Sequence, residues 1–273
     1  MTEFCRAELF YAPRVGPPLE GLQPVTVPIL DGRSAALPGW QTCGLELVDA
    51  PASVGDWTDD DRIASHHYAD VEALAVALTG ADAALVSDHV KRTAESTKRP
   101  REQSPVRLVH SDFAAGYHTV VQHSYREVGG RGAKTLERSG LTAEQIEAAP
   151  RVIMMQFWRN IGPAKMDLPM AFCDARSVTP AEGRPFPYTG YVAGGRSFDA
   201  LAIATPERAD QHDWYTFPEM AVDEVVAFRT YDTELVDAGQ THFLPHSAFP
   251  DPEVAAGQPA RFSVELRVMC LFL

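Results

Sequence analysis

The strongest constraint on the fold lies at the C-terminal end, where apolar and polar side chains alternate. Phe262, Val264, Leu266, Val268 and Cys270 fall on one side of this pattern, and Arg261, Ser263, Glu265 and Arg267 fall on the other. Successive side chains of a β-strand point to opposite faces of the sheet. The sequence therefore predicts a strand from residue 261 to 272 that buries one face in a core and carries charges on the other.

Several further short strands are predicted, separated by turns rich in proline and glycine. They cover residues 25–30, 44–48, 83–86, 106–109, 152–158, 169–173, 214–217 and 224–228. Helices are expected at 69–78, ended by Gly80, and after the capping-box sequence that begins at Thr142. Short strands combined with a few helices indicate a mainly β protein with flanking helices, a jelly roll (double-stranded β-helix, cupin-like). We expect one domain, residues 1–273, with an N-terminal α/β extension.

Composition narrows the range of partners. The 273 residues carry a formal net charge of −13, which disfavours binding to nucleic acid or to an anionic membrane surface. No apolar run is long enough to span a bilayer, and no secretory signal is visible at the start of the sequence. The four cysteines are scattered without a Cys-x-x-Cys pair, which suits a reducing compartment. We therefore expect a cytoplasmic protein.

A histidine and a carboxylate stand two residues apart at His110 and Asp112. On a strand, both side chains would point to the same side. One imidazole and one carboxylate, joined by a second imidazole from elsewhere in the chain, form the facial triad of non-haem iron oxygenases. His246 is the predicted third ligand, and His242 is the alternative.

A nearby cation is also needed if the metal works with a 2-oxo acid co-substrate. A guanidinium can hold a carboxylate through two parallel hydrogen bonds. Arg261 and Ser263 supply a guanidinium and a hydroxyl on one strand face, 15 residues after His246. They are the predicted anchor for the distal carboxylate of 2-oxoglutarate, with Arg267 and Arg92 as alternatives.

The chain resembles the CmcJ/NvfI family of oxidoreductases over most of its length. The resemblance is carried by residues 87–92, 109–112, 157–159, 168–177, 212–220, 231–233, 245–249 and 261–267. It implies a hydroxylase/desaturase-like enzyme of the Fe(II)/2-oxoglutarate superfamily, with His110, Asp112 and His246 as metal ligands and Arg261 on the co-substrate. One departure is Gln156, where similar proteins usually have an asparagine.

The resemblance implies hydroxylation, desaturation or oxidative cyclisation of a small secondary metabolite or amino-acid-derived substrate, with molecular oxygen. Candidates for contact with the substrate are His89, Arg92, Gln156, Trp158 and Tyr215. The polar segment 93–105 is expected to be an exposed loop that would suit a lid. Two other functions stay open: a zinc hydrolase or isomerase with the same ligands, and a non-catalytic partner in a two-component system.

Overall fold

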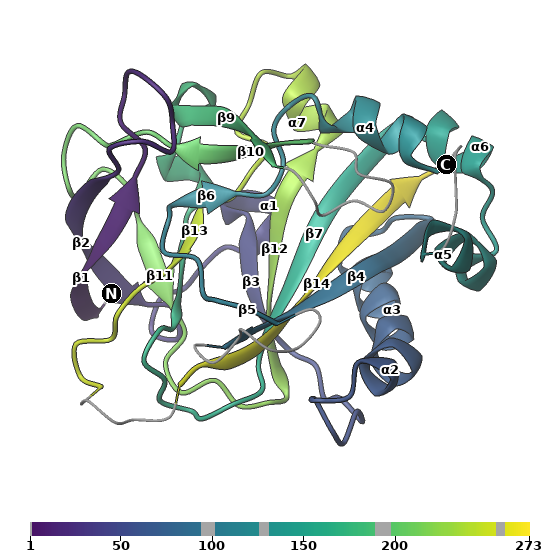
Figure 1. The fold of residues 1–273 in the computed structure, drawn as a ribbon, viewed down its shortest axis with the longest axis horizontal. Coiled ribbons are helices and arrows are strands. Elements are labelled where there is room, and N and C mark those ends of the chain that lie inside the picture. Colours follow the sequence, from purple (N-terminus) through teal and green to yellow (C-terminus); the bar gives the residue numbers. More distant parts are fainter. Residues whose placement is uncertain (1, 94–101, 126–130, 189–197, 255–259) are drawn as a thin grey trace.

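The computed structural model describes residues 2–93, 102–125, 131–188, 198–254 and 260–273, and their strands form two facing sheets (Figure 1). In spatial order, one sheet contains β1 (Glu3–Tyr11), β2 (Gln23–Asp31), β11 (Trp214–Thr216), β8 (Met170–Cys173), β13 (His246–Ala248), β6 (His110–Ser111), β10 (Phe198–Ile203) and β9 (Gly183–Tyr188). The other contains β3 (Leu45–Asp49), β12 (Glu224–Asp232), β7 (Arg151–Asn160), β14 (Phe262–Phe272), β4 (Ala83–Thr93) and β5 (Glu102–Gln103). The predicted jelly roll is confirmed.

Short helices flank the sheets. They are α1 (Trp40–Cys43), α2 (Asp60–Arg62), the π-helical turn η1 (Ile63–His67), α3 (Tyr68–Thr79), α4 (Tyr117–Ser124), α5 (Arg131–Ser139), α6 (Ala143–Ala148), the 3₁₀ turns η2 (Ala175–Ser177) and η3 (Pro180–Glu182), and α7 (Thr233–Asp237). The predicted helix ends are confirmed: Gly80 ends α3 with a left-handed φ of 72°, and Thr142 and Gln145 form the capping box of α6. No helix of the described residues is long and apolar enough to cross a membrane.

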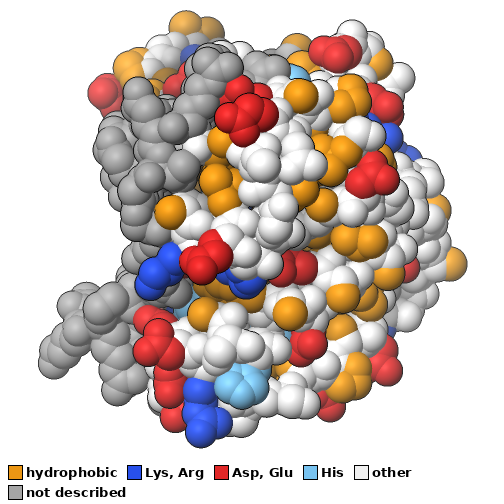
Figure 2. Space-filling view, turned by 90° about the vertical axis from the view of Figure 1, so that its right-hand side faces the viewer, with side chains coloured by type: hydrophobic (Ala, Val, Ile, Leu, Met, Phe, Trp, Pro, Cys, Tyr) orange, Lys and Arg blue, Asp and Glu red, His pale blue; other side chains and the backbone are white. Residues whose placement is uncertain are grey.

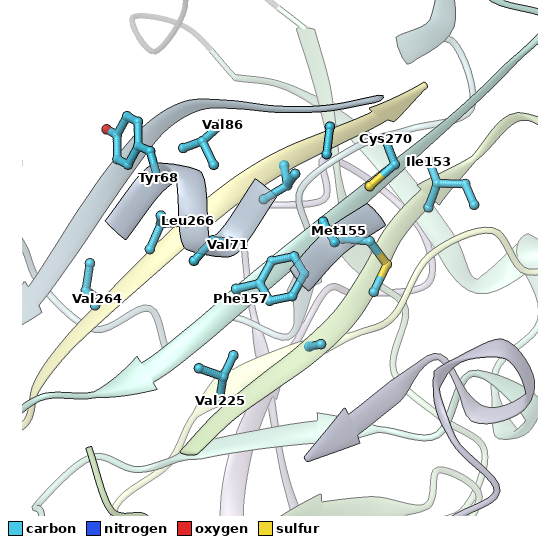
Figure 3. Close-up of a cluster of buried hydrophobic side chains, with 14 of the residues drawn as sticks. Tyr68, Val71, Val86, Ile153, Met155, Phe157, Val225, Val264, Leu266 and Cys270 are labelled. Carbon is cyan, nitrogen blue, oxygen red and sulfur yellow. The ribbon is translucent and has the colours of Figure 1, made fainter. Parts of the chain in front are cut away.

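The hydrophobic core on the outer side of the six-stranded sheet is built by the apolar face of β14. Val264, Leu266, Val268 and Cys270 pack there with residues of β7, β12 and α3, among them Phe157, Val225 and Val71 (Figure 3). Helix α3, together with the turn η1 that precedes it, covers this core (Figure 1). On the outer surface of this side, hydrophobic side chains are dispersed among charged and polar ones (Figure 2). The predicted two-faced strand is confirmed, so the polar face of β14 is turned toward the other sheet.

One expectation about local structure is corrected. The strand predicted at 106–109 is not continuous, because Val109 donates to the carbonyl of Phe10 whereas the carbonyl of Val106 accepts from Ala248. The regular strand β6 comprises only His110 and Ser111, and Asp112 follows it. The N-terminal strands are part of the two sheets: β1 and β2 join the eight-stranded sheet and β3 joins the six-stranded one. Most of the proposed lid, residues 94–101, lies outside the described residues.

Candidate metal site between the two sheets

Three potential metal ligands meet between the sheets. His110 of β6 and His246 of β13 are directly paired in the eight-stranded sheet, and their ring centroids are 4.4 Å apart. Asp112 places its Oδ1 3.8 Å from Nε2 of His110. One ligand atom from each of the three residues lies within 4.8 Å of the others, and all three residues are buried. The structure thus brings together the residues that the sequence predicted, and His242 lies outside this group.

The hydrogen bonds of the two histidines leave Nε2 available on each ring. Nδ1 of His110 lies 2.8 Å from the carbonyl oxygen of Leu108, and Nδ1 of His246 lies 3.2 Å from that of Leu244. A carbonyl only accepts, so each Nδ1 carries the proton and each Nε2 presents a lone pair. Burial lowers the pKa of both residues, that of His246 to about 3, which keeps the rings neutral at physiological pH. Neutral imidazoles oriented by a backbone carbonyl are typical metal ligands.

Asp112 is held through its other oxygen. Oδ2 accepts from Nε of Arg267 at 2.6 Å and from the side-chain amide of Gln156 at 2.5 Å. Burial raises the pKa of Asp112, but the positive charge of Arg267 and its hydrogen bond to Oδ2 oppose this effect, and the pKa lies below its usual range. Asp112 is therefore an ionised carboxylate whose Oδ1 faces the histidines.

The charged interior continues along the inward face of the six-stranded sheet. Nη2 of Arg267 donates to Oε1 of Glu265 at 3.1 Å, and Glu265 also accepts from Nε and Nη2 of Arg92 at 3.3 and 3.0 Å. Arg92 in turn donates to Gln103 and to the carbonyl of Ser104. A chain of ion pairs thus connects Arg92 of β4 to the carboxylate of Asp112, and hydrogen bonds extend it to Gln103 of β5.

Arg261 is a fully buried guanidinium with an unsatisfied donor. Its Nε donates to Oγ of Ser263 at 2.8 Å, and its Nη1 donates to the carbonyl of Leu168 at 3.2 Å. Its Nη2 has no hydrogen-bond partner in the part of the chain that the structure describes. The guanidinium lies over the ring of Trp158 at 5.2 Å. Burial, followed by the charge of Arg92, lowers the pKa of Arg261 to about 9, so the group is charged but poorly compensated.

The remaining candidates for substrate contact are placed differently. Gln156 and Arg92 lie in the charged interior. Trp158 lies under the guanidinium of Arg261 and, together with Phe172 and Phe217, lines a cavity of about 150 Å³. Tyr215 pairs with Phe172 in the eight-stranded sheet, two strands from β13.

His89 lies on the far side of the six-stranded sheet. It pairs with Leu266, whose side chain is in the outer core, and its ring bonds to Tyr68 and Asp60. Residues directly opposite each other in an antiparallel pair share a face. The prediction that His89 contacts the substrate therefore finds no support in this geometry.

The sequence did not predict the role of Glu265 or the contact between Arg267 and Asp112. The available signal was the alternating pattern, which placed Glu265 and Arg267 on the polar face of β14. This pattern carries no information about which residue of the opposite sheet Arg267 contacts.

Comparison with known proteins identifies the family. Residues 19–271 match the family model described as oxidoreductase/YMDC permease-like domain. The chain belongs to this family.

The chain is also similar to curated fungal proteins. The chain is 25% identical to the Fe(II)/2-oxoglutarate-dependent dioxygenase nvfI of Aspergillus novofumigatus over 77% of its length and 68% of the relative's. It is 26% identical to the hydroxylase/desaturase efuI of Hormonema carpetanum over 83% of its length and 76% of the relative's. The resemblance to the CmcJ/NvfI family is thereby confirmed.

Solved structures agree on the fold. The iron and alpha-ketoglutarate-dependent endoperoxidase NvfI aligns with a TM-score of 0.74 at 21% identity, covering 99% of this chain and 98% of that one. A second NvfI structure, in a different conformation, aligns with a TM-score of 0.76 over 100% and 99%. The arrangement of the two sheets is therefore shared with NvfI along nearly the whole chain.

Proposed function

We infer that this chain is an Fe(II)- and 2-oxoglutarate-dependent oxygenase that hydroxylates, desaturates or oxidatively cyclises a small molecule. The observation that carries the proposal is the convergence of two imidazole Nε2 atoms and one carboxylate oxygen in an interior where Nη2 of Arg261 has no hydrogen-bond partner among the described residues. The first feature suits a ferrous ion, and the second suits the carboxylate of a 2-oxo acid.

The donor set fits a ferrous ion on chemical grounds. Two neutral imidazoles and one carboxylate are the ligands of the facial triad, which leaves the opposite positions for exogenous ligands. His110, Asp112 and His246 would hold the metal, and the carbonyls of Leu108 and Leu244 fix the rings that present Nε2. A zinc hydrolase or isomerase uses similar ligands, but it has no need for a buried guanidinium beside them.

The charges of the interior fit a dianionic co-substrate. Arg92 and Arg267 are ion-paired with Glu265 and Asp112, whereas Arg261 feels the charges of Glu265 and Asp167 but forms no ion pair with a described carboxylate. Nη2 of Arg261 would donate to the distal carboxylate of 2-oxoglutarate, with Ser263 fixing the other side of the guanidinium. A buried cation without a counter-ion is costly unless a ligand supplies the opposite charge.

The protein residues have four tasks in such a reaction. His110, Asp112 and His246 hold the metal, Arg261 orients the co-substrate, the paired sheets exclude water, and Gln156 with Arg267 fixes the carboxylate. When bound, the metal and 2-oxoglutarate together activate molecular oxygen for the oxidation of a substrate C–H bond.

The relatives suggest the range of substrates. Two of them are called hydroxylase/desaturase and one an Fe(II)/2-oxoglutarate-dependent dioxygenase. We propose a secondary metabolite or amino-acid-derived molecule as the substrate, and we propose that residues 1–273 act as one domain. The four cysteines are free and buried, which supports our proposal of a cytoplasmic enzyme.

Anaerobic absorption spectroscopy tests this function. Fe(II) followed by 2-oxoglutarate is expected to give the visible charge-transfer band of a ferrous 2-oxo acid chelate. His246→Ala should abolish the band by removing a ligand. His242→Ala is the matched control: it truncates a buried histidine whose ring packs on Tyr231 and Phe243, outside the triad, and should keep the band. No band with the wild-type protein, or an intact band in His246→Ala, would contradict the proposal; absence of bound metal would favour the accessory-protein function instead.

A further inference from the structure

The two oxygens of Asp112 have different surroundings. Oδ2 accepts one hydrogen bond from Arg267 and one from Gln156, whereas Oδ1 faces Nε2 of His110 at 3.8 Å. A carboxylate oxygen has two lone-pair sites, so two donors saturate Oδ2. Oδ1 is consequently the oxygen that is placed to bind a metal.

The two donors are themselves held in position by the sheet. Arg267 of β14 and Gln156 of β7 stand directly opposite each other, so their side chains leave the same face at the same level. The amide of Gln156 must present its nitrogen to Asp112, because its oxygen would meet a second acceptor there. Its Oε1 accordingly has no partner within the described residues.

Arg267 is also held by a second ion pair, with Glu265. Glu265 accepts from Nη2 of Arg267, and Arg92 holds Glu265 through two hydrogen bonds. Glu265 and Arg92 are both buried, so this ion-pair chain is poorly screened by solvent. The guanidinium of Arg267 is therefore fixed at both ends, on Asp112 and on Glu265.

We propose that Arg267 and Gln156 are positioning residues that restrict Asp112 to monodentate metal binding through Oδ1. The inference rests on the proposed function. Chelation by both oxygens would require Oδ2 to leave two buried donors unpaired, one of them charged. A six-coordinate ion held by three protein atoms keeps about three positions for exogenous ligands. A bidentate Asp112 would occupy one of them and leave too few for a chelating 2-oxo acid plus oxygen.

The test counts the water molecules bound to a metal in the absence of 2-oxoglutarate. Mn(II) suits this purpose, because it is paramagnetic and accepts the same imidazole and carboxylate ligands. Water-proton relaxation with Mn(II) alone should report about three inner-sphere waters in the wild-type protein. Arg267→Met retains an unbranched apolar stem but removes the guanidinium and its donors, so Oδ2 is released and the number should fall by about one.

Two further variants separate positioning from general support of the structure. Arg267→Lys retains a charged donor for Oδ2 and should restore the wild-type number of waters. Gln156→Met removes only the neutral donor and leaves the ion pair between Arg267 and Asp112 intact. It should lower the number of bound waters partially. This variant takes the place of Arg267→Met if Arg267→Met does not fold. Loss of a merely supporting contact would weaken Mn(II) binding about 10- to 100-fold without changing the number of waters.

Arg151→Met is the control. Arg151 also forms an ion pair with an aspartate, donating two hydrogen bonds to Asp232 between β7 and β12, and it contacts none of the three ligands. Its removal should leave the number of waters unchanged. An unchanged number in folded Arg267→Met and Gln156→Met would overturn the proposal while leaving the proposed function intact. Failure of the wild-type protein to bind Mn(II), or binding that survives removal of His246, would instead overturn the metal site and with it both proposals.

Discussion

Arg261 should be unfavourable for the stability of the ligand-free protein and required for co-substrate binding. Its guanidinium is fully buried, and no described carboxylate forms an ion pair with it. Burial lowers its pKa from 12.5 to about 9. A change of that size corresponds to about 5 kcal/mol of unfavourable free energy for the charged form at neutral pH. Residues retained at such a cost are commonly functional.

We therefore expect Arg261→Met to have opposite effects on stability and on binding. Without ligand, the free energy of unfolding should be unchanged or higher by up to about 4 kcal/mol, because an apolar side chain replaces an uncompensated buried charge. Binding of 2-oxoglutarate should weaken about 30- to 700-fold, which corresponds to about 2–4 kcal/mol for the loss of charge-assisted hydrogen bonds to a carboxylate.

The assay is chemical denaturation of the ligand-free protein, combined with anaerobic titration of the Fe(II) protein with 2-oxoglutarate. Arg159→Met is the matched control. Like Arg261, Arg159 is buried and lies over a tryptophan ring, that of Trp57. Unlike Arg261, it lies on the outer side of the sheet, where it donates to the carbonyls of Ala50 and Val222. That variant should retain wild-type affinity for 2-oxoglutarate. The reasoning is refuted if Arg261→Met retains this affinity, or if its ligand-free form is clearly less stable than the wild type.

Two further predictions concern stability. Burial lowers the pKa of His67 to about 3. Below pH 6.5 this residue therefore binds a proton in the unfolded chain but not in the folded one. From this residue alone, the free energy of unfolding should fall by about 2 kcal/mol between pH 7.5 and 5. Denaturation of His67→Phe at both pH values should show that much less dependence, and an unchanged dependence would contradict the assignment. Glu219 has a φ of 51° and is the only described residue other than glycine with a positive φ. Glu219→Gly should raise the unfolding free energy by about 1 kcal/mol; a loss of stability in thermal unfolding would show that the side chain matters more than the backbone strain.

Local patterns in the sequence were sufficient for much of the fold. The alternation along 261–272 predicted both faces of β14, and Gly80 and the capping box at Thr142 marked helix ends that the structure contains. These features depend on neighbours within a few residues. The continuous strand predicted at 106–109 was wrong because its hydrogen bonds go to two distant segments, Phe10 and Ala248. Such partners are not encoded in local periodicity.

The same distinction applies to the site. Residue types and family resemblance brought together His110, Asp112 and His246, but only tertiary structure shows that Arg267 reaches Asp112, 155 residues away. The register of β7 against β14 decides that Gln156 stands beside Arg267, and a shift of one residue would turn its amide toward the outer core.

Strand parity also shows that His89 and Arg92, three residues apart in β4, belong to opposite faces. This signal was present in the sequence.

The two faces of β14 divide stability and function between them. Val264, Leu266, Val268 and Cys270 are fully buried in the outer core with α3, and burial of this apolar surface stabilises the sheet. Arg261, Glu265 and Arg267 project from the same backbone into the interior, where charges cost free energy unless they are paired. The outer core stabilises the sheet independently of ligands. The inner face can therefore carry Arg261, whose Nη2 has no partner among the described residues, and hold Oδ2 of Asp112 in hydrogen bonds. The ion pairs of this inner face are in place before any ligand arrives, which lowers the reorganisation required for binding.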